Sequence, residues 1–302
     1  MTDQDAFRAC IVRLHGQAGQ AWLERLPSLV AYLEKTWGIQ VGKPFQALSY
    51  HFVADATQAD GMEVVVKLGV PGQHLDREVE CLQRYAGVGA VQLLRHDLDL
   101  GAMLLERIRP GENLKNLDET TAVEAAVEVM RELHQAALPA GLPAVQDWGA
   151  GFRRYRVQFP GSNGPVPLPM LEEAEALFSD LAGSMEKTVL LHGDLHHENI
   201  LSSGRATWLA IDPQGVIGEP AYEVGAFLRN PMPEMLDWDH LDELLAERVS
   251  AFSALLGIDR RRIAGWGYAQ AVLSAIWSLE EHDTGWEGAL HVARALRDTA
   301  FA

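Results

Sequence analysis

The stretch His192-Gly193-Asp194-Leu195-His196-His197-Glu198-Asn199-Ile200-Leu201 decides both the fold and the chemistry of this sequence. It follows the apolar run 189–191 and precedes a second short run, 207–211, which ends at Asp212. Short apolar runs bounded by polar residues predict strands. Three polar oxygen-bearing side chains are therefore expected at the tips of neighbouring strands.

Those three side chains provide the groups that phosphoryl transfer requires. Asn199 offers a neutral amide oxygen and Asp212 a charged oxygen, the hard ligands that suit Mg²⁺ carrying substrate phosphates. Asp194 lies at the end of an apolar strand, where a carboxylate can be held rigidly at a cleft. One carboxylate left off the metal can accept a hydroxyl proton. A positioned nucleophile and a metal clamp, with little covalent chemistry by the protein, are characteristic of phosphoryl transfer.

The first ~110 residues predict a small sheet with a preceding helical region. The stretch 4–37 is expected to form helices broken around Gly16 and again near Pro27. Alternation or β-branched runs predict strands at 48–53, 62–68, 91–95 and 102–108, with a helix at 74–85.

Helical patterns dominate after Pro110-Gly111. Apolar spacing predicts helices in most of the remaining chain, except in 139–169, which holds six prolines and is expected to be a long irregular loop. The whole pattern predicts an α+β fold with a sheet-rich front and a helical back.

Composition narrows the function further. The chain has 302 residues, a formal charge of −17 and a pI near 5.0, which argues against nucleic-acid binding and permits a cationic ligand. Two cysteines exclude a disulfide framework. We see neither a signal peptide nor a run of the ~20 apolar residues that a membrane span needs, and we expect a cytoplasmic protein without a membrane or protein partner.

With these motifs in place, the sequence resembles the aminoglycoside phosphotransferase branch of the protein-kinase-like fold. H-G-D-x-x-x-x-N at 192–199, I-D-P at 211–213 and V-V-V-K at 64–67 match the family in the correct order. The stretch 212–225 is similar to the aminoglycoside/hydroxyurea antibiotic resistance kinase subgroup, which includes streptomycin 6-kinases. The resemblance implies a bilobal fold, with a small antiparallel-sheet N-lobe over 1–107 and a mainly helical C-lobe over 108–302.

The resemblance also assigns roles. Asp194 would be the catalytic base, and Asn199 and Asp212 would hold Mg²⁺. ATP would be bound by Lys67, paired with a helix glutamate, and by the backbone from Glu106 to Ile108 in the hinge. Glu78 suits the pairing better than Glu80, because Leu82 then lies one turn later on the core side. No glycine-rich loop precedes the lysine; a turn at Ser49 would cover the phosphates.

Two residues differ from the protein-kinase pattern. Gly193 replaces the arginine that in protein kinases clamps a phosphorylated activation loop, so switching by phosphorylation is not expected. Pro213 replaces the phenylalanine of D-F-G, as it does in many small-molecule kinases.

The resemblance implies that the acceptor is a small molecule bound by the helical back. A cationic aminoglycoside, with streptomycin 6-phosphorylation as the best single candidate, would be held by carboxylates, for which we single out Glu281 and Asp283. Hydroxyurea, a sugar or an endogenous metabolite are the alternatives with the same machinery. A metal-dependent phosphoesterase and a nucleotide-binding pseudokinase are the rival classes.

Overall fold

The computed structural model describes residues 3–46, 48–282 and 284–301. The chain folds as two compact units, Met1–Arg109 and Pro110–Ala302. The first contains a sheet and two helices, and the second is mainly helical, which confirms the predicted α+β fold class. Within the described residues, no helix has the length and apolarity that crossing a membrane requires.

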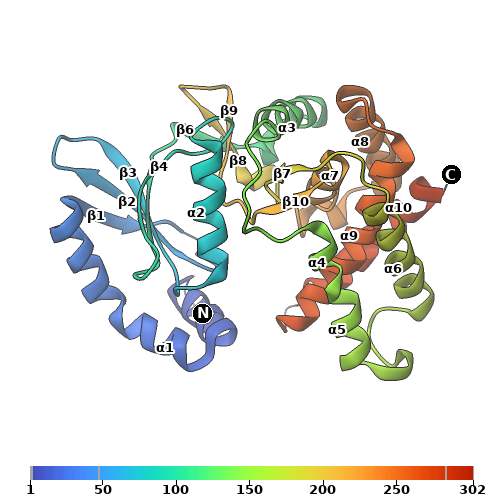
Figure 1. Cartoon of the computed structure of the whole chain (residues 1–302), viewed down its shortest axis with the longest axis horizontal. Helices are drawn as coiled ribbons and strands as arrows, with labels where there is room; N and C mark the ends of the chain where they lie inside the picture. Colours follow the sequence, from blue (N-terminus) through green and yellow to red (C-terminus); the bar gives the residue numbers. More distant parts are fainter. Residues whose placement is uncertain (1–2, 47, 283, 302) are drawn as a thin grey trace. The chain divides into compact units, whose positions relative to one another are not determined.

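The sheet of the first unit has five antiparallel strands in the order β1-β2-β3-β5-β4 (Figure 1). They are β1 (Ile39–Pro44), β2 (Phe52–Gln58), β3 (Glu63–Leu68), β4 (Leu93–Asp97) and β5 (Ala102–Glu106), with helix α2 (Gln73–Tyr85) between β3 and β4. The sequence placed the second strand several residues early, at 48–53, and missed β1. The centre of the sheet is nevertheless where the β-branched run predicted it.

Helix α1 (Asp3–Trp37) runs through the whole segment expected to be broken twice. The first expected break is present, because Gly16 has φ 55° and ψ −131° and interrupts the helical path. The second is absent, since Pro27 lies inside the helix. Trp22, Leu23 and Leu33, on either side of it, are buried in the core of this unit. This apolar packing compensates for the hydrogen bond that a proline removes.

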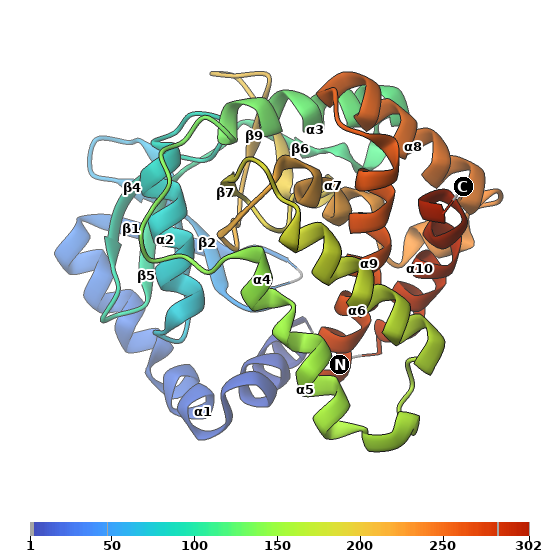
Figure 2. The ribbon, with the colours of Figure 1, turned by 45° about the vertical axis from the view of Figure 1, so that its right-hand side comes forward.

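The second unit surrounds two short sheets with helices. Its strands are β6 (Pro110–Asn113), β7 (Val189–Leu191), β8 (Ile200–Ser203), β9 (Trp208–Ala210) and β10 (Val216–Gly218). Its α-helices are α3 (Glu119–Leu133), α4 (Val145–Trp148), α5 (Ala150–Gln158), α6 (Leu168–Gly183), α7 (Pro220–Leu228), α8 (Leu241–Leu256), α9 (Arg260–Glu280) and α10 (Trp286–Phe301). The long helix α9 packs against α6, α7 and α10 and forms the centre of this unit (Figure 2).

The expectation of an irregular loop over 139–169 is wrong for much of its length. Helices α4 and α5 occupy this segment, and every one of its prolines lies outside them, at Pro143 or before and at Pro160 or after. A proline disrupts a helix when it lies in the helix interior, but a helix can still form in a proline-free stretch between two prolines. The average composition of the segment concealed a proline-free window, 144–159, which contains the buried Phe152 and Tyr155.

Candidate active site

The loop from His192 to Asn199 joins β7 to β8. Gly193 has φ +85°, and a β-carbon there would lie 2.7 Å from the Trp148 ring. Both the left-handed backbone and the close aromatic contact favour glycine. The fold therefore explains why glycine stands where protein kinases have arginine: Trp148 of α4 fills the space next to the loop.

A buried carboxylate holds the start of this loop. Glu223 of α7 is 1% exposed and accepts hydrogen bonds from the backbone N–H groups of His192 (2.6 Å) and Gly193 (2.8 Å). Hydrogen bonds to a charged acceptor are stronger than neutral ones. The main partners of Glu223 are these two amides of the loop, and His134 Nε2 lies further away, 3.6 Å from its Oε2.

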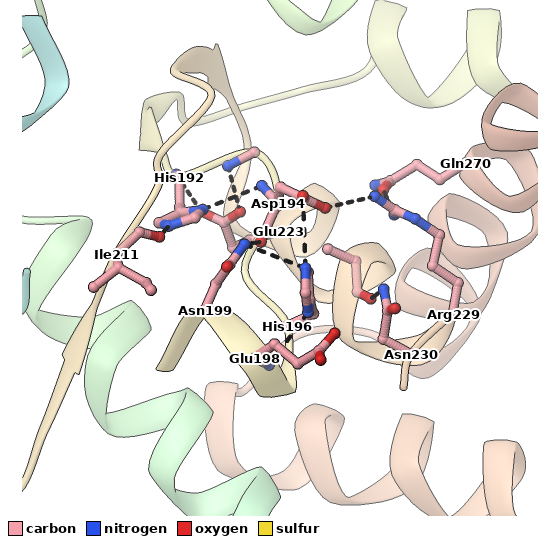
Figure 3. A network of polar contacts seen from close by, with 12 residues as sticks. His192, Asp194, His196, Glu198, Asn199, Ile211, Glu223, Arg229, Asn230 and Gln270 are labelled. Carbon is pink, nitrogen blue, oxygen red and sulfur yellow. Dashed lines mark hydrogen bonds and ion pairs between the residues drawn. The ribbon is translucent and has the colours of Figure 1, made fainter. Parts of the chain in front are cut away.

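A chain of hydrogen bonds joins this loop to Ile211, the residue that follows β9 (Figure 3). The Nε2 atom of His192 lies 2.7 Å from the Ile211 carbonyl oxygen. The Ile211 N–H donates to the Asn199 carbonyl (2.9 Å), and the Asn199 side-chain amide donates to the Asp194 carbonyl (2.9 Å). Because β8 and β9 pair with Ile200 opposite Ala210, Asn199 and the residues after β9 lie at the same end of the hairpin. The structure thus brings Asp194, Asn199 and the Ile211–Asp212 peptide together.

Asp212 itself has an uncommon backbone. Its φ is 59°, in the left-handed region that costs a non-glycine residue roughly 1–2 kcal/mol and that aspartate tolerates better than most. The residue is half-buried and lies two residues after the end of β9. Strained conformations of this kind concentrate at functional sites, where the surroundings enforce them.

Asp194 is the charged centre of this network. Burial raises the pKa of its carboxyl, but the polar contact with His196 and the positive charge of Arg229 outweigh that effect and hold the pKa well below its usual range. The Arg229 guanidinium donates to Oδ1 at 3.1 Å, and His196 Nε2 lies 3.6 Å from Oδ2. With 32% of its side chain exposed, Asp194 is an ionised carboxylate that a small molecule can reach.

His197 has a different environment from its neighbours. Its ring is buried and stacks on Phe227 with 4.0 Å between centroids. Burial, followed by the charge of Arg248, lowers the pKa of His197 to about 2. The ring is therefore neutral and part of the core.

Oxygen donors at this site fit Mg²⁺ better than a transition metal. Among the residues described, no group of three or more His, Cys, Asp or Glu side chains could hold a metal ion. Asn199 and Asp212 supply one amide and one carboxylate oxygen, and Mg²⁺ is commonly bound by one or two protein oxygens together with substrate phosphates and water. This donor set fits a metal that arrives with a nucleotide.

Within the first unit, Lys67 and Glu78 form a buried ion pair. Lys67 lies on β3, opposite Val53 and Met103 of the flanking strands. Its Nζ is 2.7 Å from Glu78 Oε1 of α2, and the two side chains are 2% and 5% exposed. Glu80, the alternative considered from the sequence, is paired instead with Arg84 of its own helix at 2.9 Å.

The remaining nucleotide-side residues lie at the ends of strands. Glu106 ends β5; its N–H donates to the Gln92 carbonyl at 3.0 Å, so an adenine contact at this residue cannot use that N–H. Ile108 is buried two residues further on. Ser49 is exposed in the segment before β2. In that segment the His51 ring lies so close to Gly69, after β3, that a β-carbon there would be 2.6 Å from it.

Of the two residues that the sequence analysis expects to hold the acceptor, Glu281 and Asp283, the structure describes only the first. Glu281 caps the end of α9 and is half-buried. Its neighbour Glu280 is held by both guanidinium nitrogens of Arg154, at 2.7 and 2.8 Å. Asp283 lies outside the described residues.

Sequence reasoning missed two residues that the structure places at Asp194. Arg229 follows α7 and bonds the carboxylate directly. Gln270, from the middle of α9, accepts from the other guanidinium nitrogen of Arg229 at 2.9 Å. An arginine directly after the apolar run 224–228 was the available signal, but no local pattern connects it to a loop 35 residues earlier.

Comparison with solved structures identifies the fold. The fold matches an aminoglycoside phosphotransferase APH(4)-Ia variant, in ternary complex with AMP-PNP and hygromycin B, with a TM-score of 0.64. That match covers 91% of this chain and 98% of the other at 14% identity. At such low identity the likeness concerns the fold alone, and the fold is that of small-molecule kinases.

Sequence comparison then assigns the family. Residues 37–282 match the model of the aminoglycoside/hydroxyurea antibiotic resistance kinases, and the chain belongs to this family of phosphotransferases. It is 28% identical to a streptomycin 6-kinase of Streptomyces glaucescens over 97% of this chain and 96% of the relative. It is 29% identical to a hydroxyurea phosphotransferase of Kitasatospora aureofaciens, over 89% and 78%. The predicted family and enzyme class are confirmed.

Proposed function

We propose that this protein transfers the γ-phosphoryl group of ATP to a hydroxyl of an aminoglycoside, with the 6-hydroxyl of streptomycin as the best single candidate. It would thereby confer resistance to the antibiotic in the cytoplasm. The observation that carries the proposal is the convergence of Asp194, Asn199 and the Asp212 backbone at one end of a single hairpin. Family membership supplies the reaction class to which that arrangement belongs.

In this proposal Asp194 acts on the acceptor. Its carboxylate accepts a hydrogen bond from the acceptor hydroxyl and orients the oxygen toward the γ-phosphorus. As the new oxygen–phosphorus bond forms, the bond to the ADP oxygen breaks and the hydroxyl proton passes to Asp194. The lowered pKa of Asp194 keeps the carboxylate ionised at neutral pH. Its contribution is therefore mainly to position the hydroxyl and to accept the proton late, as suits a loose phosphoryl-transfer transition state.

The other residues hold the nucleotide. Asn199 and Asp212 would bind Mg²⁺, which neutralises charge on the phosphates when present. Lys67, held in place by Glu78 at 2.7 Å, would bind the α- and β-phosphates. The carbonyl of Glu106 and the backbone of Ile108 would contact adenine, and Ser49 would cover the phosphates.

A cationic acceptor is consistent with the formal charge of −17. Carboxylates hold ammonium and guanidinium groups through charge-assisted hydrogen bonds, and Glu281 and Asp283 remain our candidates for this role. Hydroxyurea, a sugar or an endogenous metabolite would use the same transfer machinery. Hydroxyurea is the second candidate, because the relative named for it has nearly the same identity to this chain as the streptomycin 6-kinase.

Coupled ADP-release assays would test this proposal. Purified protein, ATP and Mg²⁺ are combined with streptomycin, other aminoglycosides, hydroxyurea and small alcohols, and products are identified by mass spectrometry. We expect ADP release that depends on streptomycin, together with a singly phosphorylated product. If ADP were released with hydroxyurea but with none of the aminoglycosides, hydroxyurea would be the acceptor. Hydrolysis of phosphate esters without ATP, or nucleotide binding without turnover on any acceptor, would overturn the proposal.

A further inference from the structure

The guanidinium of Arg229 lies between Asp194 and Gln270 (Figure 3). One nitrogen, Nη2, donates to Asp194 Oδ1 at 3.1 Å, and the other, Nη1, donates to Gln270 Oε1 at 2.9 Å. Arg229 is 12% exposed at the side chain and Gln270 is 2% exposed. The planar fork of an arginine can satisfy two acceptors at fixed directions, which the single ammonium of a lysine cannot.

Gln270 is itself fixed. Its amide nitrogen donates to the Tyr222 carbonyl of α7. A β-carbon at Gly225 would lie 2.4–2.5 Å from the Gln270 amide group, so only glycine lets the glutamine lie flat against α7. This packing sets the amide plane, and the amide in turn sets the direction of the guanidinium.

The backbone that carries Arg229 is also held from a second side. Arg248 of α8 is 1% exposed and donates to the Asn230 carbonyl at 2.7 Å. Its other nitrogens donate to both Glu119 carboxylate oxygens at 2.7 Å. The residue after Arg229 is therefore anchored to the buried guanidinium of Arg248, and Arg229 has little freedom to leave Asp194.

We propose that Arg229 is a positioning residue for phosphoryl transfer: by holding Oδ1 of Asp194 it turns Oδ2 toward the acceptor hydroxyl. This inference rests on the proposed function. Among the described residues, Oδ2 has a charged-group contact with His196 Nε2 at 3.6 Å, which is longer than a hydrogen bond. A carboxylate pinned at one oxygen and open at the other has a defined direction for accepting a proton. Misplacement of such a group by about 1 Å can cost ~100-fold in rate.

Kinetics of Arg229→Ala test the inference. We expect kcat to fall ~10–100-fold, with the KM for ATP within twofold of wild type, because Arg229 bonds Asp194, which acts on the acceptor, and Gln270. Arg229→Lys keeps the charge but not the fork, and is expected to recover only part of the loss. Added guanidinium chloride at millimolar concentration should raise the rate of Arg229→Ala with saturation and leave wild type unchanged.

Two further variants keep the test independent of folding defects. Gln270→Leu removes the second anchor while leaving Arg229 in place, and should lower kcat about fivefold, the loss of one hydrogen bond. Arg156→Ala, a control at an arginine paired with Glu175 on the surface of the same unit, should leave kcat unchanged. Thermal unfolding of every variant is recorded in parallel.

The outcomes separate the inference from the proposed function. If wild type phosphorylates an acceptor and Arg229→Ala does so at the same kcat, the positioning role is wrong while the proposed function stands. A loss of kcat that matches a loss of folded protein, without rescue by guanidinium, would also reject it. If wild type transfers no phosphoryl group to any acceptor, both fall together.

Discussion

One ion pair in each unit involves a residue of the candidate site, and the two pairs differ in how far water reaches them. Lys67 and Glu78 are 2% and 5% exposed with 2.7 Å between charged atoms. Arg229 and Asp194 are 12% and 32% exposed at 3.1 Å. The first pair is sealed between a strand and a helix, whereas the second has one partner open to solvent.

This difference assigns different tasks to the two pairs. Two buried charges compensate each other's desolvation, so removing one partner leaves an uncompensated charge. The sealed pair is therefore an internal support that holds the lysine in one place. The open pair keeps a carboxylate ionised and oriented while leaving it accessible. We expect mutations of the first to lower stability and nucleotide binding, and mutations of the second to lower turnover.

The largest expected effect is on turnover. Asp194→Asn should lower kcat ~10²–10⁴-fold, the usual contribution of a general base, because the amide cannot accept the proton. The KM for ATP and the thermal midpoint should change little. Steady-state ADP release measures this, with Asp180→Asn on the exposed surface of α6 as the control. Near-normal turnover would remove Asp194 from the catalytic role.

Mutation of the sealed pair, Lys67 and Glu78, should instead lower the stability of the protein. Glu78→Gln removes the carboxylate that lies 2.7 Å from the buried Lys67 ammonium and is expected to lower the free energy of unfolding by about 3–5 kcal/mol, and to raise the KM for ATP. Urea unfolding measures the first and ADP release the second. Glu80→Gln is a matched control on the same helix, because its pair with Arg84 is exposed and such pairs contribute about 0.3–0.5 kcal/mol. Equal effects of the two substitutions would contradict the distinction.

The oxygen donors beside the open pair should respond to metal concentration. Asp212→Asn removes a charged ligand and should raise the Mg²⁺ concentration for half-maximal activity at least about tenfold, since even outer ligand-orienting groups contribute that much. A Mg²⁺ titration of ADP release measures the shift. A curve that overlays wild type would reject the metal role of Asp212.

The smallest effect concerns a third ion pair, on the surface of the second unit. Burial raises the pKa of Glu173, but hydrogen bonds from Arg297 and Tyr268 outweigh it and leave the pKa below its usual value. A carboxyl whose folded pKa is lowered stabilises the fold above the unfolded value of 4.5, and this contribution disappears as the pH falls through the folded pKa.

Glu173→Gln should therefore lower stability at pH 7 by at most about 1 kcal/mol. The difference from wild type should shrink as the pH drops below the unfolded pKa. Urea unfolding across this range measures it, and a difference that grows with acid would contradict the sign of the pKa change.

Local patterns were enough to predict the centre of the sheet and the loop at 192–199. The run 64–67 and the H-G-D-x-x-x-x-N motif are contiguous, and their residues owe their positions to neighbouring strands. Arg229 and Gln270 could not be predicted in this way, because only the packing of α7 against α9 brings them to Asp194. The prediction of a loop over 139–169 was wrong, because it relied on the average composition of the segment. The prolines there lie on either side of α4 and α5 and do not prevent these helices from forming.

The most direct test of the central claim is a crystal structure with an ATP analogue and Mn²⁺ in place of Mg²⁺, whose anomalous signal locates the metal. We predict a metal bound between the amide oxygen of Asn199 and the carboxylate of Asp212, with the terminal phosphate beside it and Asp194 Oδ2 facing that phosphate across the space for a hydroxyl. A metal and terminal phosphate held away from Asn199 and Asp212, with Asp194 directed elsewhere, would contradict the account.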